Sequence, residues 1–156
     1  MAQQTNLLSK QSMAEICDAL NTCVADTVMT TWQAQQYHWN VTGMSFGALH
    51  DLFQQIYEDH FIAQDDLAER IKALNGHAGD KLENIISMSG ITHDAGKGSA
   101  EDMVAALADS QRKTARTLSF AAETAAQHGD MLTEDLCIQR GQQHEKFAWL
   151  LSAHLN

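Results

Sequence analysis

No proline interrupts this chain of 156 residues, and its nine glycines leave long stretches without a helix-breaking residue. Proline and glycine are the residues least compatible with the interior of a helix. Apolar residues recur at helical spacing along the longest of these stretches, and the strand-type alternation of apolar and polar residues is absent. The sequence therefore predicts an all-α protein, of a length that suits one domain with its own core.

Caps and turns divide the chain into four long helices and one short one. The predicted helices cover residues 9–37, 46–74, 82–88, 99–128 and 132–155. The first begins at Ser9 or Ser12, and Gly76 is expected to cap the second. Four long helices with two short connections and one long crossover match a ferritin-like bundle. We therefore predict a single ferritin-like domain over residues 1–156, of which 1–8 form a short flexible tail.

Several apolar side chains are expected to lie in the core of this bundle. Cys17 and Cys23 stand among apolar residues of the first helix and are expected to pack there. The core residues expected from the last two long helices are Phe120, Leu136, Phe147, Trp149 and Leu150.

Charge and cysteine usage limit the classes of function. Ten basic and twenty acidic residues give a formal net charge of −10, which argues against a general attraction to nucleic acid. An acidic surface attracts cations, although it also serves simple solubility. Three cysteines without paired spacing indicate reduced thiols in a cytoplasmic protein. Residues 1–10 lack the features of a signal peptide, and no apolar run is long enough to cross a membrane.

Potential metal ligands stand at both ends of the predicted second helix. His38 ends the first helix and His50 lies one turn into the second, so the tight turn brings both imidazoles to one end of the bundle. Asp65 and Glu69, four residues apart, share one helix face near the other end. The fifteen residues between His50 and Asp65 span roughly 22 Å of helix. No single ion bridges that distance, so a shared site needs a second chain.

An antiparallel dimer of this helix would join residues 50 and 65 of opposite chains if its two-fold axis passed near Tyr57-Glu58. Two identical sites would then form, each with two imidazoles from one subunit and two carboxylates from the other. Such mixed nitrogen and oxygen ligation suits redox iron better than structural zinc. Each piece alone also has an ordinary interpretation, because acidic pairs occur on solvated helices and histidines near helix ends act as caps.

The joint pattern resembles the Dps family (DNA-binding protein from starved cells), the miniferritins. It consists of His38-Trp39-Asn40-Val41-x-Gly43-x-x-Phe46-x-x-Leu49-His50, Asp65-x-x-x-Glu69-Arg70, Gly76 and Lys146-Phe147-x-Trp149. The resemblance implies a hollow shell of twelve subunits with ferroxidase centres at two-fold interfaces. It also implies that His38, His50, Asp65 and Glu69 are iron ligands, with Fe(II) and hydrogen peroxide or dioxygen as substrates. Zinc or another divalent ion is an alternative occupant.

One residue departs from the family pattern. Gln54 stands one turn after His50, where the family usually has an aspartate, so one of two iron positions is expected to be weaker. His60 is a candidate additional ligand, although its position around the helix favours a surface histidine. The same surface interpretation applies to His144 and His154.

Two further sets of residues have roles that only the resemblance implies. Tyr37 and Trp39 flank His38 and are candidate electron donors to the oxidant; the alternative is that both pack at a dimer interface. The acidic residues at the start of the last helix are candidates for the lining of three-fold pores through which Fe(II) enters. These residues are Asp130, Glu134 and Asp135. The alternative is stabilisation of the helix N-terminus by acidic side chains.

Three other functions compete with an iron-oxidising, iron-storing shell that protects against oxidative stress. A larger ferritin would carry Glu-x-x-His on each of two helices, and this chain has none. A DNA-compacting protein would be expected to have a lysine-rich tail, whereas only Lys10 stands in the N-terminal one, so direct DNA binding is not expected. A scaffold shell with a weakened centre is supported only by Gln54.

Overall fold

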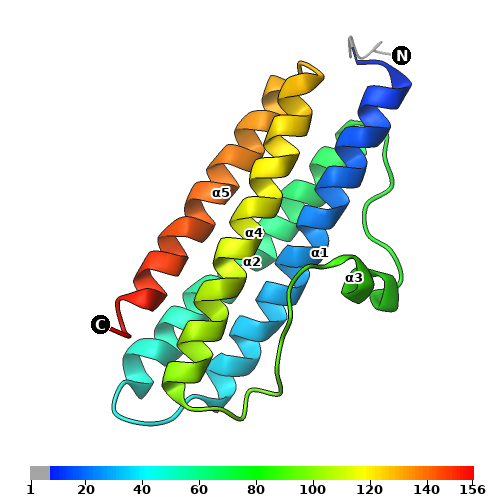
Figure 1. The fold of residues 1–156 in the computed structure, drawn as a ribbon. Coiled ribbons are helices and arrows are strands. Elements are labelled where there is room, and N and C mark those ends of the chain that lie inside the picture. Colours follow the sequence, from blue (N-terminus) through cyan, green and yellow to red (C-terminus); the bar gives the residue numbers. More distant parts are fainter. Residues whose placement is uncertain (1–7) are drawn as a thin grey trace.

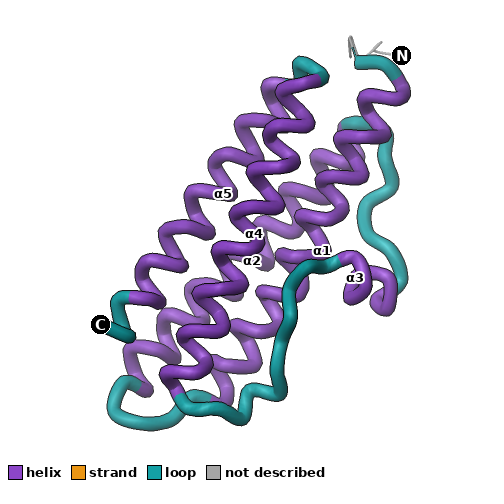
Figure 2. The backbone as a smooth tube through the Cα atoms, in the orientation of Figure 1, coloured by secondary structure: helices purple, strands orange, loops and turns teal. Residues whose placement is uncertain are grey.

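The computed structural model describes residues 8–156 and contains five α-helices in that range, without any strand (Figures 1 and 2). The helices are α1 (Lys10–Asn40), α2 (Phe46–Ala73), α3 (Leu82–Met88), α4 (Ala100–Gln127) and α5 (Met131–Ser152). The predicted fold class and the short helix in the crossover are confirmed. Within the described residues, no helix is both long and apolar enough to span a membrane. Residues 1–7 of the predicted tail lie outside the described range, and Leu8 packs partly buried against the core.

Side-chain caps mark the start of α1, α4 and α5, whereas Ser45 before α2 makes no such hydrogen bond. The hydroxyl of Ser9 accepts a hydrogen bond from the backbone N–H of Ser12 at 3.0 Å and starts α1. Ser99 and Asp102 form a reciprocal capping box at the start of α4, which satisfies two backbone N–H groups that a helix start leaves free. α1 continues to Asn40, three residues beyond the predicted end, so His38 lies in its last turn.

The end of α2 differs from the prediction in a specific way. Asn75, and not Gly76, takes the left-handed backbone conformation, with φ of 62°. Gly76 is needed for a different reason, because a Cβ built there would lie 2.6 Å from Cys17 Sγ. The glycine therefore permits a close approach between the end of α2 and α1.

Two antiparallel hairpins, α1–α2 and α4–α5, pack side by side, and the long crossover returns the chain along the outside with α3 beside α1 (Figure 1). The buried carboxylate of Asp26 on α1 holds this crossover to the bundle. It accepts hydrogen bonds from Ser89 Oγ at 2.7 Å, Gly90 N at 2.8 Å and Thr117 Oγ1 at 2.6 Å. One carboxylate thus joins α1, the crossover and α4.

The predicted core is partly right. Cys17, Cys23 and Phe147 are buried as expected. Phe120 and Trp149 are instead exposed in the single chain, with exposed fractions of 64% and 66%. Apolar spacing places a residue on one face of a helix, but it does not distinguish a face that meets its own bundle from one turned outward. Leu136 and Leu150 are partly buried against the core.

Candidate metal centre

The turn between α1 and α2 fixes His38 and His50 in a reciprocal arrangement. His38 Nδ1 lies 2.8 Å from the carbonyl oxygen of His50, and His50 Nδ1 lies 2.9 Å from the carbonyl oxygen of His38. A carbonyl oxygen only accepts, so each Nδ1 carries the proton and donates it. In the neutral rings both Nε2 atoms then keep a lone pair for a cation. Such outer hydrogen bonds are the usual way in which proteins orient metal-binding imidazoles.

Aromatic contacts hold the two imidazoles in place. The rings of His38 and His50 stack with centroids 3.7 Å apart and planes inclined by 20°. Tyr57 presents an edge-on contact to His38 at 5.3 Å, and Phe46 lies 5.0 Å from His50. Tyr57 was not predicted to be a neighbour of the centre. Its position two turns after His50, on the same face of α2, is the signal that could have identified it.

Gln54 lies one turn beyond His50 and has a fixed amide orientation. Its Nε2 donates to Glu58 Oε1 at 2.7 Å. An ionised carboxylate only accepts hydrogen bonds, so the NH₂ group of the amide must face Glu58. The opposite end, Oε1, is the end that can bind a cation, and it remains unused by this contact.

Asp65 and Glu69 stand near the other end of α2. Both are exposed, and neither makes a hydrogen bond or ion pair with any residue in the range 8–156. Exposed apolar side chains, Phe61 and Ile62, line an open groove together with Asp65. α2 is continuous between the histidine and carboxylate ends, so the roughly 22 Å separation predicted from helix rise stands.

A single chain does not assemble a complete centre. Within residues 8–156, no three His, Cys, Asp or Glu side chains come together in a way that could hold a metal ion. The structure brings His38, His50 and Gln54 to one end of α2, and it leaves Asp65 and Glu69 at the other. A centre built from all of these side chains requires a second subunit.

The surface interpretation of His60 and His144 is wrong. Both side chains are fully buried between the hairpins, and their rings lie 4.4 Å apart. His60 contacts Asp59 and Gln111 through its two ring nitrogens, so it does not face the same surface as His50 and is not an additional ligand there. His154 is exposed, as predicted.

The two aromatic residues beside His38 have different environments. Tyr37 is fully buried in the bundle, and its hydroxyl donates to Asp94 Oδ2 in the crossover at 2.9 Å. Burial holds the pKa of the Tyr37 phenol well above its ordinary value. Trp39 is 57% exposed and packs edge-on against Trp32. Trp39 is therefore available to a partner subunit, whereas Tyr37 packs within its own chain.

The structure separates Asp130 from the other predicted pore residues. Its carboxylate is buried, caps α5 at the N–H of Thr133, and pairs with Arg70 of α2 at 2.8 Å. Burial opposes its ionisation, but hydrogen bonds from Thr133 and the Arg70 guanidinium keep the pKa of Asp130 below its usual value. Glu134 is half-buried and Asp135 is exposed, so these two are the acidic side chains still accessible.

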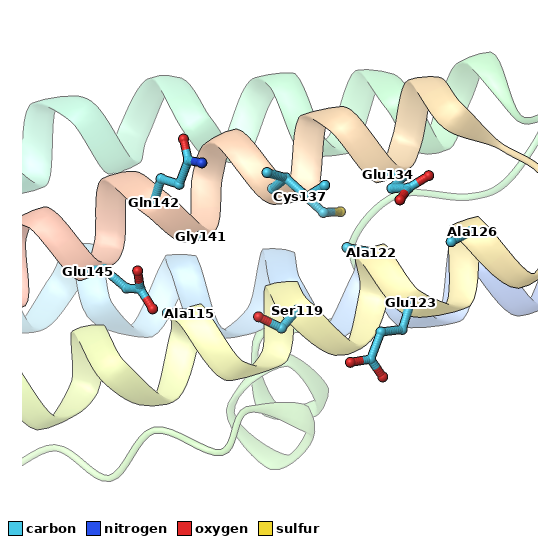
Figure 3. Close-up of a pocket in the computed structure, with 11 residues that line it drawn as sticks. Ala115, Ser119, Ala122, Glu123, Ala126, Glu134, Cys137, Gly141, Gln142 and Glu145 are labelled. Atoms are coloured by element: carbon cyan, nitrogen blue, oxygen red, sulfur yellow. The ribbon is translucent and has the colours of Figure 1, made fainter.

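A separate groove runs between α4 and α5 (Figure 3). Small side chains line much of it, and its three carboxylates, Glu123, Glu134 and Glu145, are spread along its length and do not converge. None of the four predicted ligands lines this groove. The candidate centre lies instead on α1 and α2.

Comparison with known proteins identifies the family of this chain. A family model described as a ferritin-like domain matches residues 17–156. General stress protein 20U of Bacillus subtilis is 32% identical, over 90% of this chain and 97% of its own length. The chain belongs to the Dps family of ferritin-like proteins. DNA protection during starvation protein 2 of Bacillus anthracis is 31% identical, over 91% of this chain and 97% of that protein.

A solved Dps structure shares the whole fold. The Dps protein of Vibrio cholerae O1, described as a member of a broad superfamily of ferritin-like diiron-carboxylate proteins, superposes with a TM-score of 0.91. It is 27% identical, and the match covers 100% of this chain and 99% of that one. The Dps-family assignment predicted from the sequence is confirmed. In general terms, the chain is a miniferritin of the iron-storing kind.

Proposed function

We propose that this Dps-family protein is a ferroxidase that oxidises Fe(II) at centres shared between two subunits and stores the ferric product in a shell of twelve chains in the cytoplasm. The observation that carries the proposal is the reciprocal bonding of His38 and His50. It directs two free Nε2 atoms to one end of α2, while two unpaired carboxylates, Asp65 and Glu69, stand near the other. Protection against oxidative stress follows from consuming Fe(II) together with its oxidant.

An antiparallel pairing of two α2 helices completes the centre. With the two-fold axis near Tyr57 and Glu58, the histidine end of each helix meets the carboxylate end of the other. Exposed Phe61 and Ile62 beside Asp65 provide apolar surface that such an interface would cover. The same operation produces two equivalent centres, as a two-fold axis requires.

The side chains have complementary tasks at this centre. The carboxylates of Asp65 and Glu69 attract the cation and stabilise Fe(III) more than Fe(II), because the ferric ion carries the higher charge. The neutral imidazoles bind without adding negative charge, and Gln54 offers an amide oxygen to a second, weaker ion. Each Fe(II) gives up one electron, and hydrogen peroxide takes up two electrons and two protons to yield two water molecules. Dioxygen is the alternative oxidant.

We assign the entry of Fe(II) to Glu134 and Asp135 at the start of α5. Asp130 is given a positioning task, because its bonds to Arg70 and Thr133 fix the helix start from which those two side chains project. Trp39, exposed next to His38, is the aromatic side chain best placed to give an electron to the oxidant at the interface. Tyr37 remains a second candidate electron donor.

The first test is an anaerobic Fe(II) titration of the metal-free protein, followed by addition of peroxide and measurement of ferric absorbance. We expect rapid, saturable oxidation that the His50→Ala/Asp65→Ala variant lacks. The stoichiometry would also report how far Gln54 weakens the second position. Oxidation no faster than in buffer, or equally fast in the variant, would contradict the proposal.

Mixed shells test the shared centre directly. In a dimer of one His50→Ala chain and one Asp65→Ala chain, both lesions fall in the same centre, and the other centre is intact. Random co-assembly of these two inactive variants should therefore restore about a quarter of the centres, since about half of the dimers are mixed. The matched control mixes His50→Ala with His38→Ala, which damages every centre and should restore none. Absence of rescue in the first mixture would exclude a shared centre.

The alternative function is a DNA-compacting or scaffold shell with a weakened centre. The net charge of −10 opposes DNA binding, because phosphate groups repel an acidic surface. A gel-shift measurement at low salt distinguishes this alternative. Retarded DNA together with absent ferroxidase activity would replace the proposal with it.

A further inference from the structure

Five side chains form a largely buried polar cluster between the two hairpins, and we call this cluster the inter-hairpin latch. Asp59 and His60 come from α2, Gln111 from α4, and Arg140 and His144 from α5. Arg140 Nη2 donates to Asp59 Oδ2 at 2.6 Å, and His60 Nδ1 lies 2.9 Å from the same oxygen. Gln111 Oε1 lies 3.1 Å from His60 Nε2 and 2.6 Å from His144 Nδ1.

The latch is closed to solvent at its centre. His60, Gln111 and His144 are fully buried, and the ring of Phe147 packs edge-on against His60 at 5.5 Å. The charged groups that face the two rings are Asp59 from α2 and Arg140 from α5. α4 contributes the uncharged amide of Gln111. Within residues 8–156, no charged group of α1 acts on either ring.

Stability alone does not account for the latch. Three of its buried atoms have no hydrogen-bond partner among the described residues: Gln111 Nε2, Arg140 Nε and His144 Nε2. Buried polar groups without partners cost stability, and apolar side chains of similar size would hold the hairpins together at least as well.

Counting protons shows that the latch has two arrangements. Asp59 accepts, so His60 Nδ1 must carry a proton. If Gln111 Oε1 faces both rings, as in the structure, then His60 Nε2 must also carry a proton, and His60 is an imidazolium ion. If the amide is rotated by half a turn, its NH₂ group donates one hydrogen to each ring, and both histidines are neutral. Amide oxygen and nitrogen have nearly the same shape, so the two arrangements fit the same space.

Electrostatics favours the neutral arrangement at pH 7. Burial lowers the pKa of His60, although Asp59 partly opposes this effect. Burial, and then the neighbouring His60 and Arg140, hold the pKa of His144 well below its ordinary value. An unfolded chain protonates these rings below about pH 6.5, before the folded chain does. Stability is therefore complete above that pH and is lost as the pH falls.

We propose that the inter-hairpin latch is an acid-sensitive lock, which holds the α1–α2 and α4–α5 hairpins together while its imidazoles are neutral and releases them on protonation. The lock goes beyond the proposed ferroxidase function and is independent of it. It implies that mild acid, in the range where histidines titrate and most carboxylates do not, loosens the subunit from inside the bundle.

The test compares unfolding of the metal-free protein by guanidinium chloride at pH 7.5, 6.5 and 5.5. For each latch proton that the folded chain excludes, the unfolding equilibrium constant of the wild type should rise up to about tenfold per pH unit below pH 6.5. His60→Gln/His144→Gln should lack this additional rise. The control His154→Gln removes an exposed histidine beyond the end of α5 and should behave like the wild type. Parallel pH profiles for the wild type and the double variant would overturn the proposal.

Gln111→Glu keeps the test decisive if the double variant does not fold. A carboxylate between the rings accepts from both of them and favours their charged forms. The acid-induced loss of stability should then become smaller or disappear, because a higher pKa of the folded rings approaches that of the unfolded chain. An unchanged profile for Gln111→Glu would equally overturn the lock.

Discussion

This bundle contains two pairs of closely packed histidines, and the two pairs have opposite chemical character. His38 and His50 stack at 3.7 Å at the end of the α1–α2 hairpin. His60 and His144 lie 4.4 Å apart between the two hairpins, in the interior of the bundle. In the first pair, backbone carbonyls bind both Nδ1 atoms and leave both Nε2 atoms free. In the second pair, both rings are fully buried and contact the side chain of Gln111.

The difference shows that the partner of each ring nitrogen decides what a histidine can do. A carbonyl oxygen fixes one tautomer and leaves the other nitrogen as a ligand. A glutamine amide presents either a donor or an acceptor, so it allows a ring to change its protonation state. Proximity of two imidazoles alone predicts neither a metal centre nor a pH-dependent lock.

The largest expected effect separates the two pairs by activity. His50→Ala should reduce the initial rate of peroxide-driven Fe(II) oxidation roughly 100-fold or more, because it removes a ligand outright. His144→Gln should leave the rate per folded shell unchanged. Stopped-flow ferric absorbance measures both variants. An equal loss in the two would show that the pairs do not have separate roles.

The second-largest expected effect is on stability, and it concerns the ion pair beside the interior histidines. Asp59→Ala leaves Arg140, whose side chain is 14% exposed, without its partner, and should lower the free energy of unfolding by about 2 kcal/mol. Asp109→Ala removes the exposed ion pair with Lys113 and should change it by less than about 0.5 kcal/mol. Guanidinium unfolding at pH 7.5 measures the difference. Similar values for both variants would contradict a structural role for the interior ion pair.

A third prediction sharpens the comparison at the His38–His50 pair. Gln54→Asp adds a negative charge one turn from His50 and should tighten anaerobic Co(II) or Fe(II) binding at the weaker position by roughly tenfold. Gln55→Asp adds the same charge on another face of α2 and serves as the control. Isothermal titration calorimetry reports both affinity and stoichiometry. Equal affinities for the two variants would place the second ion away from Gln54.

The smallest effect concerns the aromatic neighbour of His38. Tyr57→Phe keeps the edge-on contact and should change metal affinity by less than about twofold, whereas Tyr57→Ala should weaken it about threefold. The same calorimetric titration measures both. A large effect of Tyr57→Phe would mean that the hydroxyl, and not the ring, acts at the centre.

Much of the fold and part of the centre could be predicted because they depend on short stretches of chain. The short helix over 82–88 follows from local composition, and His38 meets His50 because only a tight turn separates them. Phe120 and Trp149 could not be placed, since helical spacing does not tell which apolar face meets the bundle. The pairing of Asp130 with Arg70 could not be predicted either, because it joins residues 60 positions apart in the sequence.

The helices and the family followed from the sequence alone. The sequence also predicts that two chains share one centre, because the rise of a helix is fixed per residue. His50 and Asp65 are separated in any fold that keeps α2 intact. Tertiary packing then decided which histidines keep a free nitrogen and which are buried against Gln111, 51 residues beyond His60. Burial and hydrogen-bond partners arise where distant segments pack, and these contacts set the protonation state and ligand capacity of each ring.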